Sequence, residues 1–257
     1  PYWYLILMAL AIPHYYLLWK NSTQRNFFTM HNWVIAVSLI IMLGAFIGSR
    51  YPYPEWAFVG YLSLFSIFYG IGQSVYFAGS KNMANPLLLL GISGTMVILM
   101  IWSFGEMAQQ IIADHANKAA FFTWLFSYII IALLIVNCLQ ILVVQKRKVL
   151  INFSPVELSP FLLALSILLV GHFPEVTGFI INGWILLIGL YYVRRGSRIN
   201  HLGILNFGLL IILTLAILRF FDDSIPFVWR GLFFLVTGAS FFIANYWMLR
   251  KRKQASR

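Results

Sequence analysis

FFTWLFSYIIIALLIVNCLQILVVQKRK, residues 121–148, is an apolar run that ends in three basic residues. The apolar part is long enough to cross a bilayer as one helix, which takes about 20 mostly apolar residues. Lys146, Arg147 and Lys148 follow it directly, and basic residues beside a membrane segment favour the cytoplasmic side. The stretch therefore predicts a transmembrane helix whose carboxyl end faces the cytoplasm.

The composition of the whole chain has the same character. Of its 257 residues, 61% are hydrophobic and 10% are charged, and the mean hydropathy is +0.84. Soluble domains carry about a quarter charged residues, and one core of a chain this long could not bury so much apolar surface. We therefore expect an all-α polytopic transmembrane helix bundle, with the lipid bilayer as the solvent for most of the chain.

About nine apolar segments suited to the membrane follow one another along the chain. Their ranges are 1–19, 33–48, 56–78, 86–104, 119–145, 158–171, 176–193, 202–220 and 226–249. Most of the 18 Lys and Arg residues lie in alternate connections and in the tail, at 20–32, 79–85, 145–157, 194–201 and 250–257. Most of the 7 acids lie in the other connections, at Glu55, Glu106, Asp114, Glu175, Asp222 and Asp223. The alternation supports the segment count and predicts a cytoplasmic carboxy-terminus.

The sequence indicates a single domain, because nothing interrupts the succession of apolar segments. No internal repeat, linker or shift in composition divides the chain, so we interpret residues 1–257 as a single transmembrane helical domain. The chain starts at Pro1, inside an apolar run, which favours a longer protein with further residues upstream. The net charge of +11 belongs largely to the cytoplasmic rim, where it suits anionic lipid headgroups. We therefore expect the bilayer, and not nucleic acid, as the partner of these charges.

Segments 158–171 and 176–193 form an irregular pair. The first has about 14 residues, roughly 21 Å at 1.5 Å per residue, against a hydrocarbon core of about 30 Å. Either the pair is an ordinary short hairpin in a thinned bilayer, or its tip GHFPE, residues 171–175, re-enters the membrane. The re-entrant alternative makes His172 and Glu175 candidates for lining a cavity. His14, after Pro13 in the first segment, is a further candidate, or else a hydrogen-bonded histidine between helices.

Recognisable catalytic, metal-binding and nucleotide-binding motifs are absent from the sequence. No charged residue lies near the middle of an apolar segment, where transporters place groups that bind protons or ions. The 5 histidines fall on different segments, and the single cysteine, Cys138, lies inside an apolar run. We therefore expect no catalytic residue, no metal and no cofactor.

Polar and small residues inside the segments indicate helix packing. Amide side chains between membrane helices contribute about 0.6–2 kcal/mol each, and we assign this role to Gln73, Asn137, Gln140, Asn182, Asn206 and Asn245. Asn206 and Asn245 lie at similar depth near the inner face, so they are predicted to approach each other. Gly231, Gly238 and Asn245 recur every seven residues and predict a closely packed seam.

The stretch RFFDDSIPFVWRG, residues 219–231, gathers four charges in one outer connection. As a clasp, Arg219 ends one helix, Asp222 and Asp223 precede the next, and the helix dipoles favour these signs at these ends. Arg230 then pairs with an aspartate. As a site, the two arginines receive an anionic headgroup, phosphate or carboxylate. A divalent metal on the two aspartates is a third alternative, weakened by the arginines alongside.

The carboxy-terminal quarter resembles a known family. VRRGSR at 193–198 and LNFGLLIILTLAILRFFDDSIPFVWRGLFFLVTGASFFIANYWMLRKRK at 205–253 are similar to the carboxy-terminal part of a family of predicted bacterial multi-pass membrane proteins of unknown function. The matching positions are Arg194, Arg195, Gly196, Asn206, Gly208, Arg219, Phe220, Phe221, Asp222, Arg230, Gly231, Gly238 and Asn245. The resemblance implies a bacterial inner-membrane location, and it supplies no substrate and no catalytic residue.

Three function classes follow from these observations. The leading expectation is a non-enzymatic scaffold or accessory subunit of an envelope or membrane assembly, whose partner is another membrane protein or a second copy of the chain. The alternative is a carrier of a small anionic or lipid-like substrate that uses Arg219, Arg230 and the GHFPE tip. A membrane-embedded enzyme ranks third, because it would require histidines and acids from distant segments to converge.

Overall fold

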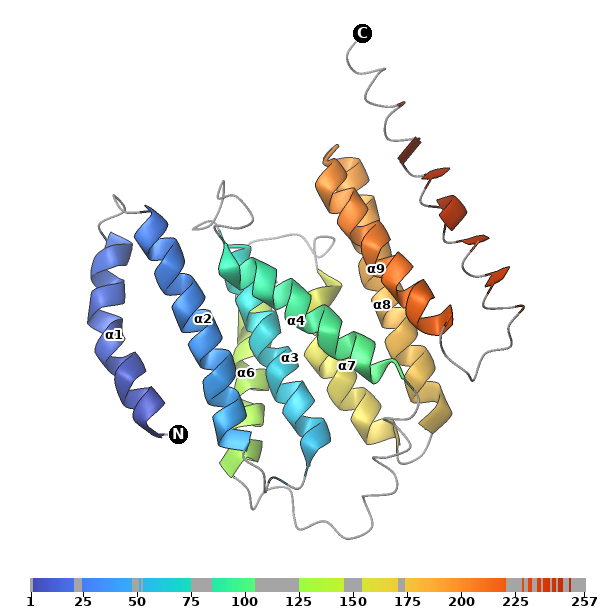
Figure 1. Ribbon diagram of the computed structural model, residues 1–257. Coiled ribbons are helices and arrows are strands. Elements are labelled where there is room, and N and C mark those ends of the chain that lie inside the picture. Colours follow the sequence, from blue (N-terminus) through green and yellow to red (C-terminus); the bar gives the residue numbers. More distant parts are fainter. Residues whose placement is uncertain are drawn as a thin grey trace. The chain divides into compact units, whose positions relative to one another are not determined.

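The fold was analysed in a computed structural model of the chain (Figure 1). The structure describes residues 2–20, 25–47, 51, 53–74, 85–104, 125–145, 154–170, 174–220 and isolated positions between 228 and 250. All regular structure in these ranges is helical, and they contain no strand. The helices are α1 (Tyr2–Lys20), α2 (Arg25–Ile47), α3 (Pro54–Gly72), α4 (Pro86–Trp102), α6 (Leu125–Gln145), α7 (Pro155–Val170), α8 (Pro174–Arg198) and α9 (Leu202–Phe220). The expected all-α fold class is confirmed.

Four helices are long and apolar enough to cross a membrane, which indicates a membrane protein. They contain the stretches Phe27–Ile47, Leu125–Val143, Val176–Arg198 and Leu202–Phe220. Shorter apolar helices cover Ala9–Leu18, Pro86–Trp102 and Pro155–Val170. The count of about nine segments stays a prediction, and most of segment 226–249 lies outside the described residues.

Proline begins several of the helices. Pro54, Pro86, Pro155 and Pro174 each stand at the first position of a helix, where the missing N–H is not needed. At α4 the carboxamide oxygen of Asn85 also accepts a hydrogen bond of 3.1 Å from the backbone N–H of Leu88. Asn85 therefore caps α4, and Pro86 occupies its first turn.

Two helices extend well beyond the limits of their apolar runs. Helix α2 begins at Arg25, eight positions before the apolar segment 33–48, and α8 continues to Arg198, beyond segment 176–193. The assignment of residues 194–201 to a loop was therefore wrong for the arginines, since Arg194 and Arg195 lie in the last turns of α8. Arginine is a good helix former, so the end of an apolar run marks membrane depth and not the end of the helix.

The described contacts divide the chain into two compact units. One comprises residues 1–98 and 110–171, and the other comprises residues 99–109 and 172–257. The division falls within α4, whose last turn belongs to the second unit. The interpretation as one domain stays a prediction.

Helix α3 is the centre of the first unit. It packs against α6 and α7, and its side chains include the buried Leu62, Phe65 and Tyr69. Helix α4 approaches it closely, because a Cβ built at Gly91 would lie 2.6 Å from the backbone nitrogen of Tyr69. Small residues let membrane helices come together at this distance.

Helices α8 and α9 form the body of the second unit and lie side by side (Figure 1). A Cβ at Gly208 would lie 2.5 Å from the backbone nitrogen of Val193, and a Cβ at Gly196 would collide with the backbone of Leu205. The turn between the helices contains Asn200, whose φ of 53° is left-handed. Asparagine is the residue after glycine that best tolerates this conformation at a helix end.

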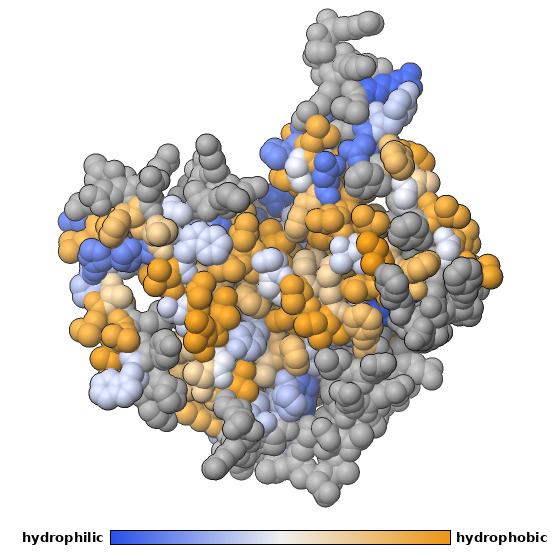
Figure 2. Space-filling model, viewed as in Figure 1, coloured by the Kyte–Doolittle hydropathy of each residue, from blue (hydrophilic) through white to orange (hydrophobic). Residues whose placement is uncertain are grey.

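Large apolar side chains are exposed along the helices. Leu10, Leu139, Leu168 and Phe179 are all more than half exposed, and Phe179 is 79% exposed. Figure 2 shows hydrophobic residues spread across the face in view, with hydrophilic ones concentrated near helix ends. Contiguous exposure of this kind is tolerated where lipid is the solvent.

Candidate functional site

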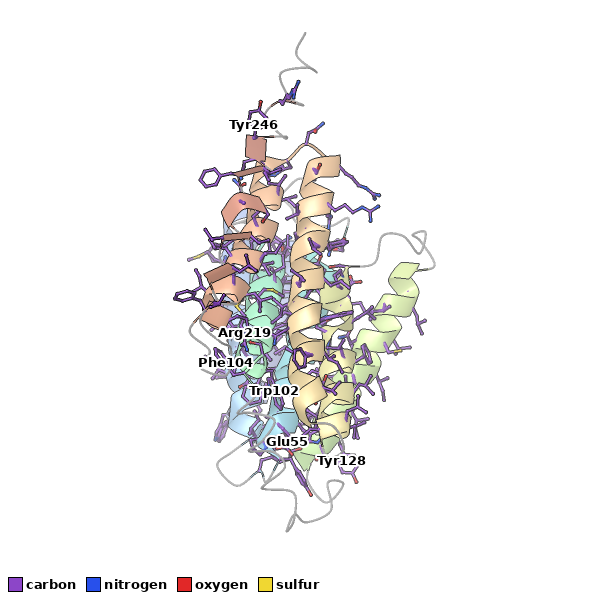
Figure 3. All side chains as sticks on the ribbon, turned by 90° about the vertical axis from the view of Figure 1, so that its right-hand side faces the viewer. Glu55, Trp102, Phe104, Tyr128, Arg219 and Tyr246 are labelled. Atoms are coloured by element: carbon purple, nitrogen blue, oxygen red, sulfur yellow. The ribbon has the colours of Figure 1, made fainter. Side chains whose placement is uncertain are left out.

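Arg219 stands in the last turn of α9 and contacts residues just beyond the end of α4. Its Nη2 donates a hydrogen bond of 2.9 Å to Oγ of Ser103. Its guanidinium carbon lies 4.8 Å from the ring centroid of Phe104, in cation–π geometry (Figure 3). All three residues belong to the second unit. The sequence analysis named Arg219 but neither of these two partners.

Ser103 is the centre of this arrangement. Its side chain is 1% exposed, and its hydroxyl donates to the backbone carbonyl of Met100 at 2.6 Å while it accepts from Arg219. The backbone carbonyl of Ser103 accepts a bond of 3.5 Å from Nδ2 of Asn182 in α8. Ser103 thus receives hydrogen bonds from α8 and α9. We call Ser103, Phe104, Asn182 and Arg219 the Ser103 junction.

The chemistry of the Ser103 junction is that of a held cation. A guanidinium does not lose its proton in proteins, and it has five N–H donors in a rigid plane. Ser103 and Phe104 are neutral partners that position the guanidinium. A cation over an aromatic ring contributes about 0.5–2 kcal/mol, the larger value when water is excluded. The junction can therefore join helices or receive an anion.

The remaining residues of the predicted clasp cannot be compared with this arrangement. Asp222, Asp223 and Arg230 lie outside the described residues, and so does His172. Glu175 lies in the first turn of α8, but its side chain is outside the described residues. The clasp, the anion site and the metal site therefore stay three open predictions from the sequence.

The predicted approach of Asn206 to Asn245 also stays a prediction. Asn206 is exposed on α9, and Asn245 is half-buried. A Cβ built at Gly231 or Gly238 would meet no atom within 4 Å among the residues that the structure describes. The close packing predicted for that seam stays a prediction, since most of its surroundings lie outside the described residues.

Two of the predicted amides do join helices. Nε2 of Gln140 in α6 donates to the backbone carbonyl of Ile67 in α3 at 3.2 Å. Asn182 does the same toward Ser103. In the first unit, Tyr69 in α3 adds a bond of 2.8 Å to Oγ of Ser154, which precedes α7. Polar side chains at these positions hold neighbouring elements together.

A buried carboxylic acid was missed by the sequence analysis. Glu55 was assigned to an outer connection, but it is the second residue of α3 and only 2% exposed. An acid in the first turn of a helix interacts favourably with the helix dipole, and this position after Pro54 was the available signal. No other acidic side chain among those the structure describes is buried to this degree.

Glu55 lies close to a group of hydroxyls and rings at one end of the first unit. The hydroxyl of Tyr51 is 3.1 Å from Oγ of Ser127 in α6, and its ring packs edge-on against Phe126 at 4.9 Å. Burial raises the pKa of Tyr51; the Ser127 hydrogen bond opposes this rise, and the negative charge of Glu55 adds to it. Tyr51 therefore stays a neutral hydrogen-bonding group.

His14 lies against α2 on the exposed side of the α1–α2 pair. Its ring centroid is 5.1 Å from that of His31 and 6.4 Å from that of Phe27. The position between two helices agrees with the alternative of an interhelical histidine. Elsewhere in the described ranges, no group of three or more His, Cys, Asp or Glu residues is arranged to hold a metal ion.

Comparison of the chain with protein-family models, curated proteins and solved structures gave no match.

Proposed function

We propose that the protein is a non-enzymatic integral membrane protein, acting as a scaffold or accessory subunit of a membrane assembly. The proposal rests on one observation: polar side chains in both units form hydrogen bonds to other elements of the chain. Gln140, Asn182 and Arg219 each bond to another element of the chain. An interior whose polar groups hold helices together suits a protein that presents a fixed surface.

The topology and location belong to the same proposal. We place about nine segments across the membrane, a number that rests on apolar runs of about 20 residues. The carboxy-terminus faces the cytoplasm, as the alternation of basic connections favours. Helix α7 has 16 residues, so we favour an ordinary hairpin over a re-entrant tip. The bacterial inner membrane is proposed on the family resemblance alone.

Photo-crosslinking in native membranes tests the scaffold proposal. A photoreactive amino acid at Phe179, which is 79% exposed on α8, should form adducts with another polypeptide. The same probe at Ile181, which is 0% exposed on the same helix, is the matched control and should give only intramolecular products. Two differently tagged copies of the chain distinguish a homo-oligomer from a different partner.

The outcome that contradicts the proposal is a set of exposed probes that meet only lipid. Leu10 on α1 and Leu139 on α6 extend the test to other exposed faces. If probes at Phe179, Leu10 and Leu139 give no protein adduct in membranes at native expression levels, the chain has no stable partner on these faces. The scaffold proposal would then be abandoned.

A carrier of small anions is the second candidate, favoured by the guanidinium of the Ser103 junction. Arg219 is half-buried, donates to a hydroxyl and lies over an aromatic ring, and a guanidinium is the group that best matches phosphate and carboxylate oxygens. Inorganic phosphate or a short-chain alkyl phosphate should raise the melting temperature of purified wild-type protein. Arg219→Lys should weaken this effect and Arg219→Gln should abolish it. A melting temperature independent of both anions excludes this candidate.

A further inference from the structure

Two histidines from neighbouring helices meet on the exposed side of the α1–α2 pair. His14 lies in α1 and His31 in α2, and their ring centroids are 5.1 Å apart. His14 is exposed and His31 is half-buried. Each lies about 9 Å along its helix from the end that meets the α1–α2 connection, at 1.5 Å per residue.

The contacts around the two histidines hold them in register. Tyr15 in α1 stacks on Phe28 at 5.5 Å and donates a hydrogen bond of 2.9 Å to Oδ1 of Asn32. His14 packs edge-on against Phe27 at 6.4 Å. Two consecutive residues of α1 thus each contact α2, and the side chains that they contact lie one turn apart on that helix. The backbone on both sides of the histidine pair is therefore fixed.

The tautomer of His31 suits metal binding. Its Nδ1 lies 3.3 Å from the backbone carbonyl oxygen of Phe27. A carbonyl oxygen can only accept, so Nδ1 carries the proton, and in the neutral ring Nε2 then presents its lone pair. Metal-binding histidines commonly donate their other N–H to a backbone carbonyl in this way, which fixes the ring and its tautomer.

The separation of the rings agrees with a shared ion. In a tetrahedral site with Zn–N bonds of about 2.0–2.1 Å, each ring centroid lies about 3.2 Å from the metal, so two centroids are about 5.2 Å apart. The observed separation is 5.1 Å. Imidazole nitrogen suits Zn²⁺, Ni²⁺ and Cu²⁺, and it does not suit Mg²⁺ or Ca²⁺.

We propose that His14 and His31 form a two-histidine site for a divalent transition metal, bound through imidazole nitrogen of both rings. No third protein ligand accompanies them among the described residues, so water or an outside ligand completes the coordination. The metal clamps α1 to α2 and leaves open positions on the exposed side. The sequence alone gave no reason to pair these residues, since they lie on different segments.

Titration of the purified full-length chain with ZnCl₂ tests the proposal, with calorimetry for stoichiometry and melting temperature for stability. We expect one Zn²⁺ per chain and a rise in melting temperature. His14→Gln and His31→Gln should each weaken binding by at least about tenfold, the effect usual for disturbed metal sites. Acidification should release the metal, because protons compete with the metal for imidazole nitrogen.

The matched control is His201→Asn. His201 caps α9 by accepting a bond of 3.3 Å from the N–H of Ile204, and asparagine is also a good capping residue. This variant removes one histidine elsewhere and should keep wild-type zinc binding. If folded His14→Gln and His31→Gln bind Zn²⁺ as wild type does, or wild type binds none at millimolar ZnCl₂, the site does not exist. Should one variant fail to fold, the other decides the question.

Discussion

At the residue scale, Ser103 carries more interactions than its small side chain suggests. Its hydroxyl donates to Met100 and accepts from Arg219, and its carbonyl accepts from Asn182. Because the hydroxyl is buried, its loss cannot be repaired by bulk water. Removing the hydroxyl takes an acceptor away from the charged guanidinium of Arg219. Losing one partner of a buried hydrogen bond costs more than losing both.

Ser103→Ala should therefore lower the free energy of unfolding by about 1–3 kcal/mol. Ser93→Ala is the matched control in the same helix region, because the exposed Ser93 bonds only to the carbonyl of Leu89 one turn earlier. That change should be within about 0.5 kcal/mol of wild type. Thermal unfolding in detergent compares the two variants. Equal losses would mean that the Ser103 junction does not stabilise the fold.

Tyr51 supplies a prediction about pH. Burial raises its pKa above the usual value of about 10, so the folded chain keeps a proton that the unfolded chain loses in alkali. The free energy of unfolding therefore decreases as pH rises, because the folded state binds more protons than the unfolded state. The contribution of buried Tyr51 to stability should be complete below about pH 10 and should decrease progressively above it.

The measurement compares wild type with Tyr51→Phe, since other tyrosines contribute equally to both. Wild type should be the more stable protein at neutral pH, by about 0.5–1.5 kcal/mol for one hydrogen bond. The difference should shrink as pH rises from about 10 to 11.5. A stability difference that is constant or increases over this range would show that Tyr51 ionises as readily in the folded chain as in the unfolded one.

At the element scale, the α8–α9 contact depends on glycine. Gly196→Ala places a methyl group against the backbone of Leu205, which has no alternative rotamer. We expect a loss of about 1–3 kcal/mol, the usual result of overpacking. Gly183→Ala on the same helix meets nothing within 4 Å among the described residues and should gain up to about 1 kcal/mol from helix propensity. Thermal unfolding of both variants should give opposite signs; a loss at Gly183 or none at Gly196 would contradict this account.

The elements show how far the sequence could be followed. The predicted segment 202–220 coincides with α9, because a turn precedes it and its apolar run is unbroken. Helices α2 and α8 extend past their apolar runs, since polar and basic residues continue a helix once it leaves the hydrocarbon. An apolar run indicates which residues face lipid. The end of a helix is determined by its backbone hydrogen bonds.

The candidate site was predicted less completely than the helices. Arg219 was singled out because it is charged at the end of an apolar run. Ser103 lies 116 residues before it, so no local pattern joins them. His14 and His31 are likewise joined only by the packing of α1 on α2. Contacts between distant segments depend on which helices become neighbours, and hydropathy does not determine that.

At the scale of the whole molecule, the single cysteine can report membrane exposure. Cys138 is exposed on α6, within the candidate span Leu125–Val143. A thiol facing lipid should resist both a small membrane-permeant maleimide and a charged, impermeant one in sealed vesicles, because the thiolate is the reacting species and hydrocarbon disfavours a charged group. Both reagents should react after denaturation, which is the control. Rapid modification by the charged reagent in sealed vesicles would place this face of α6 in water.

The same reagents locate the carboxyl end of α8. In a Cys138→Ser background, a cysteine at Asn200 should be modified only from the cytoplasmic side, because Arg194, Arg195 and Arg198 precede it. A cysteine replacing Phe179, near the other end of α8, should not be modified from that side. Modification of both positions from one side would mean that α8 does not cross the membrane.

The short turn at Asn200 has a consequence for how the protein is made. Only residues 199–201 separate α8 from α9. The faces of both helices that contain glycine pack closely against each other. Each helix needs the other to form its packing contacts. We therefore expect both to enter the bilayer during synthesis as one helical hairpin. In the topology that we propose, the arginines at the end of α8 remain on the side from which the ribosome delivers the chain, and insertion proceeds without moving their charges through the lipid.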